Sequence, residues 1–168
     1  MVCLMTFKKM FHVVFAVLLG LSLRAHGAVI LQYHHVSESL PAVTSVSSET
    51  FTEHMQYLKD NNFNVIPLDE LITSLQTGQP LTDKTVAITF DDGYKNNYEE
   101  AAPILEKFGY PYTIFVNPEL IDEGKSYVMT WQQLKELSKQ GALISNHTQI
   151  HNYLHTKQPG ESEKTWLG

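Results

Sequence analysis

Two adjacent carboxylates, Asp91 and Asp92, follow an apolar run in the segment ITFDDGYKNNY, residues 88–98. Asp-Asp-Gly is a common turn sequence, because Asp bonds its own backbone and Gly accepts a positive φ. Two carboxylates at the end of a strand can also supply one metal ligand and one general base. Taken alone, the motif leaves both interpretations open.

Histidines gather at two other points of the chain. His34 and His35 follow the apolar run VILQY, and His147 and His151 stand four residues apart in NHTQIH. A spacing of four places two imidazoles on one face of a helical turn, which suits a metal but is weak evidence without a further ligand. His34 and His35 could equally be polar residues at a strand end.

Together these residue types fit a catalytic zinc site, which takes three ligands from His nitrogen and carboxylate oxygen and keeps a fourth position for water. One aspartate with His147 and His151 supplies that set, and nickel or cobalt would also fit. The other aspartate could act as a base, because neighbouring strand residues point to opposite sides and Gly93 permits a sharp turn. Cys3 is the only cysteine, which disfavours a structural zinc site.

The elements that must position these residues are short. Five apolar runs predict strands at 29–33, 63–66, 86–90, 113–116 and 142–145. Most of them lack alternation, as expected of strands covered on both faces. Helical patterns lie between them, with predicted capping boxes at Thr50/Glu53 and Thr130/Gln133 and with stops at Gly78, Gly109 and Gly141.

Strands that alternate with helices predict an α/β fold with a parallel sheet. The three polar clusters follow the first, third and fifth predicted strands. In a parallel sheet these positions lie on one edge, outside the carboxyl ends of the strands, where α/β folds place their active sites. We therefore expect the three clusters to converge.

The segments TFDDGY and HTQIH resemble the first two signature motifs of the polysaccharide deacetylases, the NodB-homology or carbohydrate esterase family 4 enzymes. The flanking YEEAAPILEKFGYPYTIFV and MTWQQLKELSKQGALISNHT are similar too, so the resemblance covers about residues 29–154. It implies a distorted (β/α) barrel, here partial with about five parallel strands. It also implies a divalent metal, usually zinc, and removal of acetyl groups from an N-acetylated polysaccharide.

The resemblance further implies a role for each site residue. Asp91 would be the base, and Asp92, His147 and His151 would be the metal ligands. LQYHHV is similar to the Tyr-His-x-Val of a subgroup that includes exported poly-N-acetylglucosamine deacetylases, which implies that His34 is the acid. Water deprotonated by the base would attack the acetamide carbonyl, and the acid would protonate the departing amine.

Residues 1–27 have the pattern of a secretory signal peptide: two lysines, an apolar run and Ala25-His26-Gly27. A membrane anchor is the alternative, but the run of about 14 residues is shorter than the roughly 20 that cross a bilayer. We expect export to the periplasm or the extracellular space. Cleavage would change the formal charge from −6 to −9, because three basic residues leave; this disfavours nucleic acid and anionic lipid as partners.

Residues 28–168 are predicted to form one NodB-like domain that is truncated at its C-terminus. A full barrel needs about 200 to 250 residues, so we expect the front part of a longer enzyme, with open strand edges that favour aggregation. Two other functions remain open. One is a carbohydrate-binding domain without catalysis, which Asp91 disfavours because a binding domain needs no base. The other is a metal-dependent hydrolase of different amides or esters.

Overall fold

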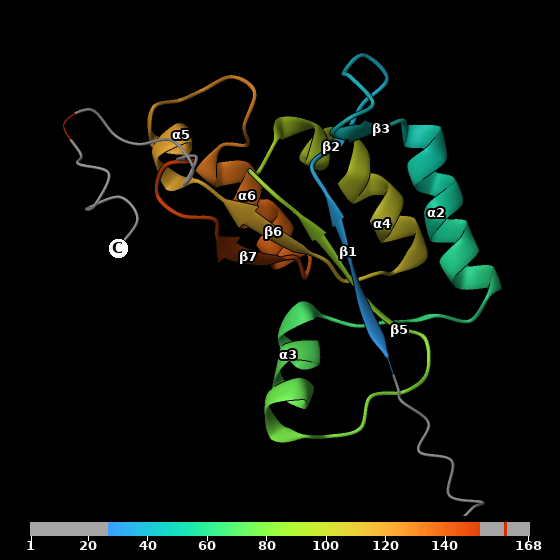
Figure 1. Cartoon of the computed structure of the whole chain (residues 1–168). Helices are drawn as coiled ribbons and strands as arrows, with labels where there is room; N and C mark the ends of the chain where they lie inside the picture. The colour runs from blue at the N-terminus through green and yellow to red at the C-terminus, as the bar shows by residue number, and fades with distance from the viewer. Residues whose placement is uncertain (1–26, 152–159, 161–168) are drawn as a thin grey trace, which may run out of the picture.

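The structure is a computed structural model that describes residues 27–151 and residue 160. Five parallel strands form its main sheet: β1 (Ala28–Tyr33), β4 (Asn64–Val65), β5 (Thr85–Phe90), β6 (Thr113–Val116) and β7 (Leu143–Asn146). Strand β5 pairs with β1 on one side and with β4 and β6 on the other, and β6 pairs with β7. Figure 1 shows β1, β5, β6 and β7 in this sheet. The predicted α/β fold with a parallel sheet is confirmed.

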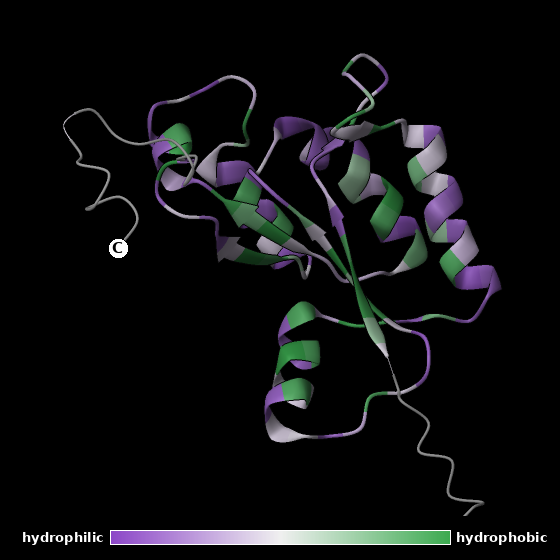
Figure 2. Cartoon of the chain, in the orientation of Figure 1, coloured by the Kyte–Doolittle hydropathy of each residue, from purple (hydrophilic) through white to green (hydrophobic). Residues whose placement is uncertain are grey.

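Strand β5 lies in the middle of the sheet, and all six of its residues are buried. Val86, Ile88 and Phe90 belong to the larger hydrophobic core, whereas Ala87 packs in a second cluster with Leu71. Side chains of successive strand residues point to opposite faces, so both faces of β5 are covered. This double coverage is why the sequence of the strand shows no alternation (Figure 2).

Helices supply the cover on both faces. They are α2 (Ser48–Asp60), α3 (Leu68–Thr77), α4 (Ala102–Phe108), α5 (Pro118–Asp122) and α6 (Trp131–Lys139), with a π-helical segment η1 (Asn97–Ala101) before α4. Helices α2, α4 and α6 contribute Phe51, Leu105 and Leu137 to the larger core, and α3 contributes Leu71 to the second cluster.

One of the two predicted capping boxes is correct. Thr130 and Gln133 cap α6 reciprocally, as expected. The prediction for α2 is wrong by one turn: its N-cap is Ser47, whose hydroxyl accepts a hydrogen bond from the Thr50 backbone N–H at 3.0 Å. Thr50 and Glu53 lie inside the helix, because Ser47 offers the same capping chemistry three residues earlier.

The third predicted helix begins as the π-helical segment η1 and continues as α4. Pro103 stands in the first turn of α4, where it has no N–H to donate to the preceding turn. A wider turn upstream is one way in which a helix accommodates such a residue. The helix ends at Gly109 in the left-handed conformation, as predicted.

Three elements of the structure were not predicted. Strands β2 (His35–Val36) and β3 (Ser45–Val46) form a small parallel pair directly after β1, and α5 follows β6. Each has at most five residues, which is too short for a periodic pattern to show. Both β2 and α5 nevertheless follow strands at the edge that carries the polar clusters.

In the described part of the chain, β1 pairs only with β5 and β7 pairs only with β6, so the sheet is open at both ends. Val29 and Ile30 of β1 are about half exposed, at 52% and 49%. None of the helices within residues 27–151 has the length and hydropathy to cross a membrane. The predicted leader lies outside the described residues, apart from Gly27.

Candidate active site

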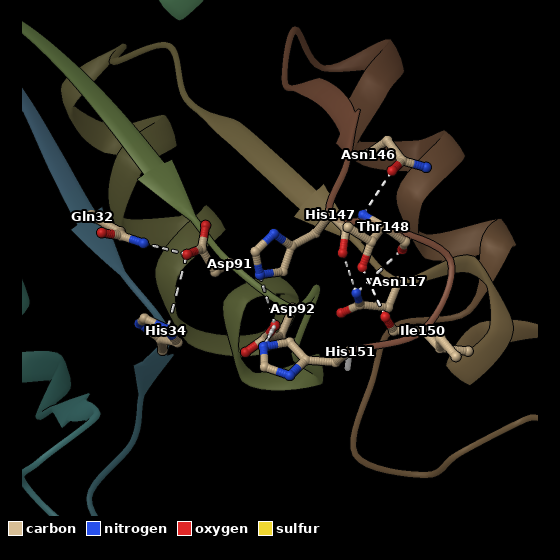
Figure 3. Close-up of polar contacts among 10 residues, drawn as sticks. All are labelled: Gln32, His34, Asp91, Asp92, Asn117, Asn146, His147, Thr148, Ile150 and His151. Atoms are coloured by element: carbon tan, nitrogen blue, oxygen red, sulfur yellow. Dashed lines mark hydrogen bonds and ion pairs between the residues drawn. The ribbon is translucent and has the colours of Figure 1, made fainter. Parts of the chain in front are cut away.

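The three polar clusters converge at the carboxyl ends of β1, β5 and β7. Asp92 Oδ1 lies 3.4 Å from Nε2 of both His147 and His151, and Asp91 Oδ2 lies 3.9 Å from Nε2 of His34. Figure 3 shows Asp91 directed toward His34 and Asp92 toward the two histidines of the β7 end. The five residues singled out in the sequence thus meet at one site, although up to 117 positions separate them.

Asp92, His147 and His151 form a group that fits a divalent cation. One ligand atom from each lies within 4.8 Å of the others. Asp92 Oδ1 is buried and accepts no hydrogen bond from the residues that the structure describes. A buried carboxylate oxygen without a donor is costly unless a positive charge faces it. The two imidazoles are 34% and 42% exposed, so the solvent side of the group is open, as in catalytic metal sites.

The Asp-Asp-Gly turn gives the two carboxylates their different directions. Asp92 and Gly93 both adopt left-handed backbone conformations, with φ values of 66° and 63°. A Cβ atom added at Gly93 would lie 2.9 Å from Cγ1 of Val116, so both the turn and the close approach require glycine. The Asp-Asp-Gly segment is therefore a turn, as its structural interpretation predicts. The same turn directs the two carboxylates to different sides, as a metal ligand and a base would require.

The two histidines after β7 meet by a different route from the predicted one. The spacing of four suggested a helical turn, but residues 147–151 have no regular secondary structure. Thr148 adopts a left-handed φ of 66°, which reverses the chain between the imidazoles. The two rings lie 5.4 Å apart between centroids, inclined at 62°. The expectation of a shared helix face is wrong, although the pair does face one carboxylate.

Asp91 has a partner that the sequence did not reveal. The side-chain amide of Gln32 on β1 donates a hydrogen bond to Oδ2 of Asp91, the same oxygen that faces His34 (Figure 3). The backbone N–H of Asp91 donates to the Tyr33 carbonyl at 2.9 Å, which continues the β1–β5 ladder. Only this register brings Gln32 to the end of β5, so residue type alone could not indicate it.

His35 does not join the metal group. Its ring stacks on Tyr94 with centroids 3.6 Å apart, and its Nδ1 lies 3.0 Å from the Asn96 amide nitrogen. Burial lowers the pKa of His35, opposed by the Asn96 hydrogen bond. His35 therefore packs against the loop that follows Gly93, while its neighbour His34 faces Asp91.

The fold and this site together define a class, the α/β proteins with a carboxylate and histidine group at the carboxyl edge of a parallel sheet. A family model described as polysaccharide deacetylase matches residues 78–166, more than half of the chain. The chain belongs to the polysaccharide deacetylase family.

Individual relatives agree with this assignment. The Bacillus subtilis protein YxkH, whose name places it among polysaccharide deacetylases, is 34% identical over 80% of this chain and 47% of its own length. The poly-beta-1,6-N-acetyl-D-glucosamine N-deacetylase of Escherichia coli K12 is 26% identical over 76% of this chain and 21% of its own length. The chain therefore spans about half or less of these curated relatives.

A solved structure shows the same fold. The Streptococcus pyogenes deacetylase PplD, determined in complex with acetate, superimposes with a TM-score of 0.70 at 28% identity. The match covers 79% of this chain and 61% of PplD. The predicted partial deacetylase barrel is confirmed by this likeness.

Proposed function

We propose that this chain carries the metal-binding and catalytic groups of a hydrolase that removes N-acetyl groups from an N-acetylglucosamine-containing polysaccharide. The observation that carries the proposal is the juxtaposition of the Asp92–His147–His151 group with a second carboxylate, Asp91, and a further imidazole, His34. The substrate class is supported by the Escherichia coli relative, whose name specifies poly-beta-1,6-N-acetyl-D-glucosamine.

Asp92, His147 and His151 are the proposed metal ligands. Zinc fits two nitrogens and one carboxylate oxygen best, and nickel or cobalt would also fit. The chemistry that such a cation supplies is Lewis acidity toward water and toward the acetyl carbonyl.

Asp91 is the proposed base and His34 the proposed acid. Asp91 takes a proton from the attacking water, whose oxygen forms a bond to the acetyl carbon. The carbon–nitrogen bond then breaks, and His34, as the acid, gives a proton to the departing nitrogen, leaving a free amine and acetic acid, which ionises to acetate. The Gln32 amide holds Oδ2 of Asp91 without adding a charge beside it.

Export is part of the same proposal and is supported by the leader pattern of residues 1–27. The predicted boundaries, a leader to residue 27 and a truncated NodB-like domain from residue 28, are proposals as well. The comparison with longer relatives supports the proposed truncation, because this chain covers 47% of YxkH and 61% of PplD.

Acetate release tests the function directly. The purified chain, supplied with zinc, should release acetate from N-acetylated β-1,6-glucosamine oligomers, and a chelator should stop the release. Chitin oligomers, peptidoglycan and acetylated xylan tested in parallel separate this substrate from other acyl substrates. Oligomer binding without acetate release would instead favour the carbohydrate-binding alternative and contradict the proposal.

Replacing His34 by alanine is expected to lower kcat by about 100-fold and to leave the zinc content unchanged, because the departing amine loses its proton donor. Steady-state kinetics and metal analysis of the same preparation measure both quantities. His54→Ala is the matched control. His54 belongs to α2, and its imidazole contacts the Tyr33 hydroxyl. Wild-type turnover in His34→Ala would remove this residue from the mechanism.

A further inference from the structure

The loop after β7 carries two of the three proposed metal ligands, yet it is not itself part of a helix or strand. Residues 147–151 are irregular, and Thr148 has a left-handed φ of 66° that a threonine rarely adopts. A β-branched residue in this conformation is held there by its surroundings. The contacts that hold this loop therefore decide where the imidazoles of His147 and His151 lie.

Asn117 makes the central contact to this loop from another part of the chain. It is 1% exposed and stands between β6 and α5. Its side-chain nitrogen donates to the carbonyl of His147 at 2.5 Å and to the carbonyl of Thr148 at 3.3 Å. These carbonyls lie on both sides of the left-handed step (Figure 3), so one amide group fixes the direction in which the chain turns.

Further hydrogen bonds place the loop on the same β6–α5 connection. The His147 N–H donates to the Val116 carbonyl at 2.8 Å, and the Glu119 N–H donates to the Gln149 carbonyl at 3.2 Å. The Thr148 N–H also donates to Oδ1 of Asn146, the last residue of β7, at 2.7 Å. The loop is thus anchored by backbone groups at two positions and by the Asn117 side chain between them.

The oxygen and the nitrogen of the Asn117 amide differ in their hydrogen bonding. Oδ1 is buried and has no hydrogen-bond partner among the residues described here. An unsatisfied buried carbonyl is destabilising, so the oxygen does not explain why an amide stands at this position. Its nitrogen, by contrast, satisfies two carbonyls that an apolar side chain would leave without a donor.

We propose that Asn117 is a positioning residue that presets the 147–151 loop, so that both imidazoles face Asp92 before a cation binds. The inference rests on the proposed metal site for its function. Partners that orient metal ligands typically change metal affinity by about 10- to 100-fold when they are removed. A preset loop binds more tightly because less ordering remains to be done on binding.

The test uses the full chain without metal and two variants. Asn117→Asp keeps the shape but turns the donor into an acceptor against two carbonyls, and Asn117→Leu removes the donor without adding charge. Amide hydrogen exchange of residues 146–151 should become at least about tenfold faster in both variants, while exchange in β5 stays at the wild-type rate. The zinc Kd, measured by competition titration, should rise by about tenfold.

Asn97→Leu is the matched control. Asn97 is also 1% exposed, and its side-chain nitrogen and oxygen make no hydrogen bond within the described residues. Losing this amide should leave loop exchange and the zinc Kd unchanged. A merely structural role for Asn117 would instead raise exchange in β5 together with the loop and lower Tm, and that result would overturn the inference.

The outcomes also separate this inference from the proposed function. If loop exchange accelerates in the variants but the wild-type chain binds no zinc, the positioning role is upheld and the proposed metal site is contradicted. Unchanged loop exchange in both variants would overturn the inference, whatever the zinc affinity.

Discussion

Replacing Asp92 by asparagine is expected to weaken zinc binding by more than about 100-fold and to abolish acetate release. Removal of an orienting partner already costs about 10- to 100-fold in affinity, and loss of a charged ligand should cost more. Asparagine accepts left-handed φ values as readily as aspartate, so the turn at φ 66° should persist. Competition titration with a zinc chelator measures the affinity, and circular dichroism checks the fold.

Asp69→Asn provides the control for the loss of one carboxylate, since Asp69 is an exposed residue in the first turn of α3. This variant should bind zinc as the wild type does. If Asp92→Asn bound zinc with wild-type affinity, the metal group proposed here would be wrong, because Asp92 is its only carboxylate within the described residues.

Asp91→Asn is expected to lower kcat by about 1,000-fold while zinc affinity changes little. General bases typically contribute 100- to 10,000-fold, and the amide oxygen of asparagine cannot take a proton from water near neutral pH. The same oxygen can still accept the hydrogen bond from Gln32, so the local geometry should survive. Kinetics on acetylated glucosamine oligomers and a zinc titration of the same sample separate the two effects.

The two neighbouring aspartates therefore act as controls for each other. Asp91 faces β1 through Gln32 and His34, and Asp92 faces the loop after β7. Asp92→Asn should lose metal and activity together, whereas Asp91→Asn should lose activity alone. If Asp91→Asn lost zinc and Asp92→Asn retained it, Asp91 would be the metal ligand and Asp92 the base.

Much of the fold could be predicted from local sequence patterns, because short-range physics decides them. The apolar run of β5, the capping box at Thr130 and Gln133 and the stop at Gly78 depend on neighbouring residues alone. The N-cap of α2 was misplaced because Ser47 and Thr50 both have capping side chains, and in the structure it is the Ser47 hydroxyl that accepts the Thr50 N–H.

The sequence by itself determined which residue types meet at the site. The clusters follow three parallel strands, and parallel strands present their carboxyl ends at one edge. Only the tertiary structure decided how these residues meet. The left-handed Thr148 is stabilised by Asn117, which precedes it by 31 positions, and Gln32 reaches Asp91 through the β1–β5 register. Such contacts join distant segments, so their effect on the backbone cannot be deduced from the spacing of residues.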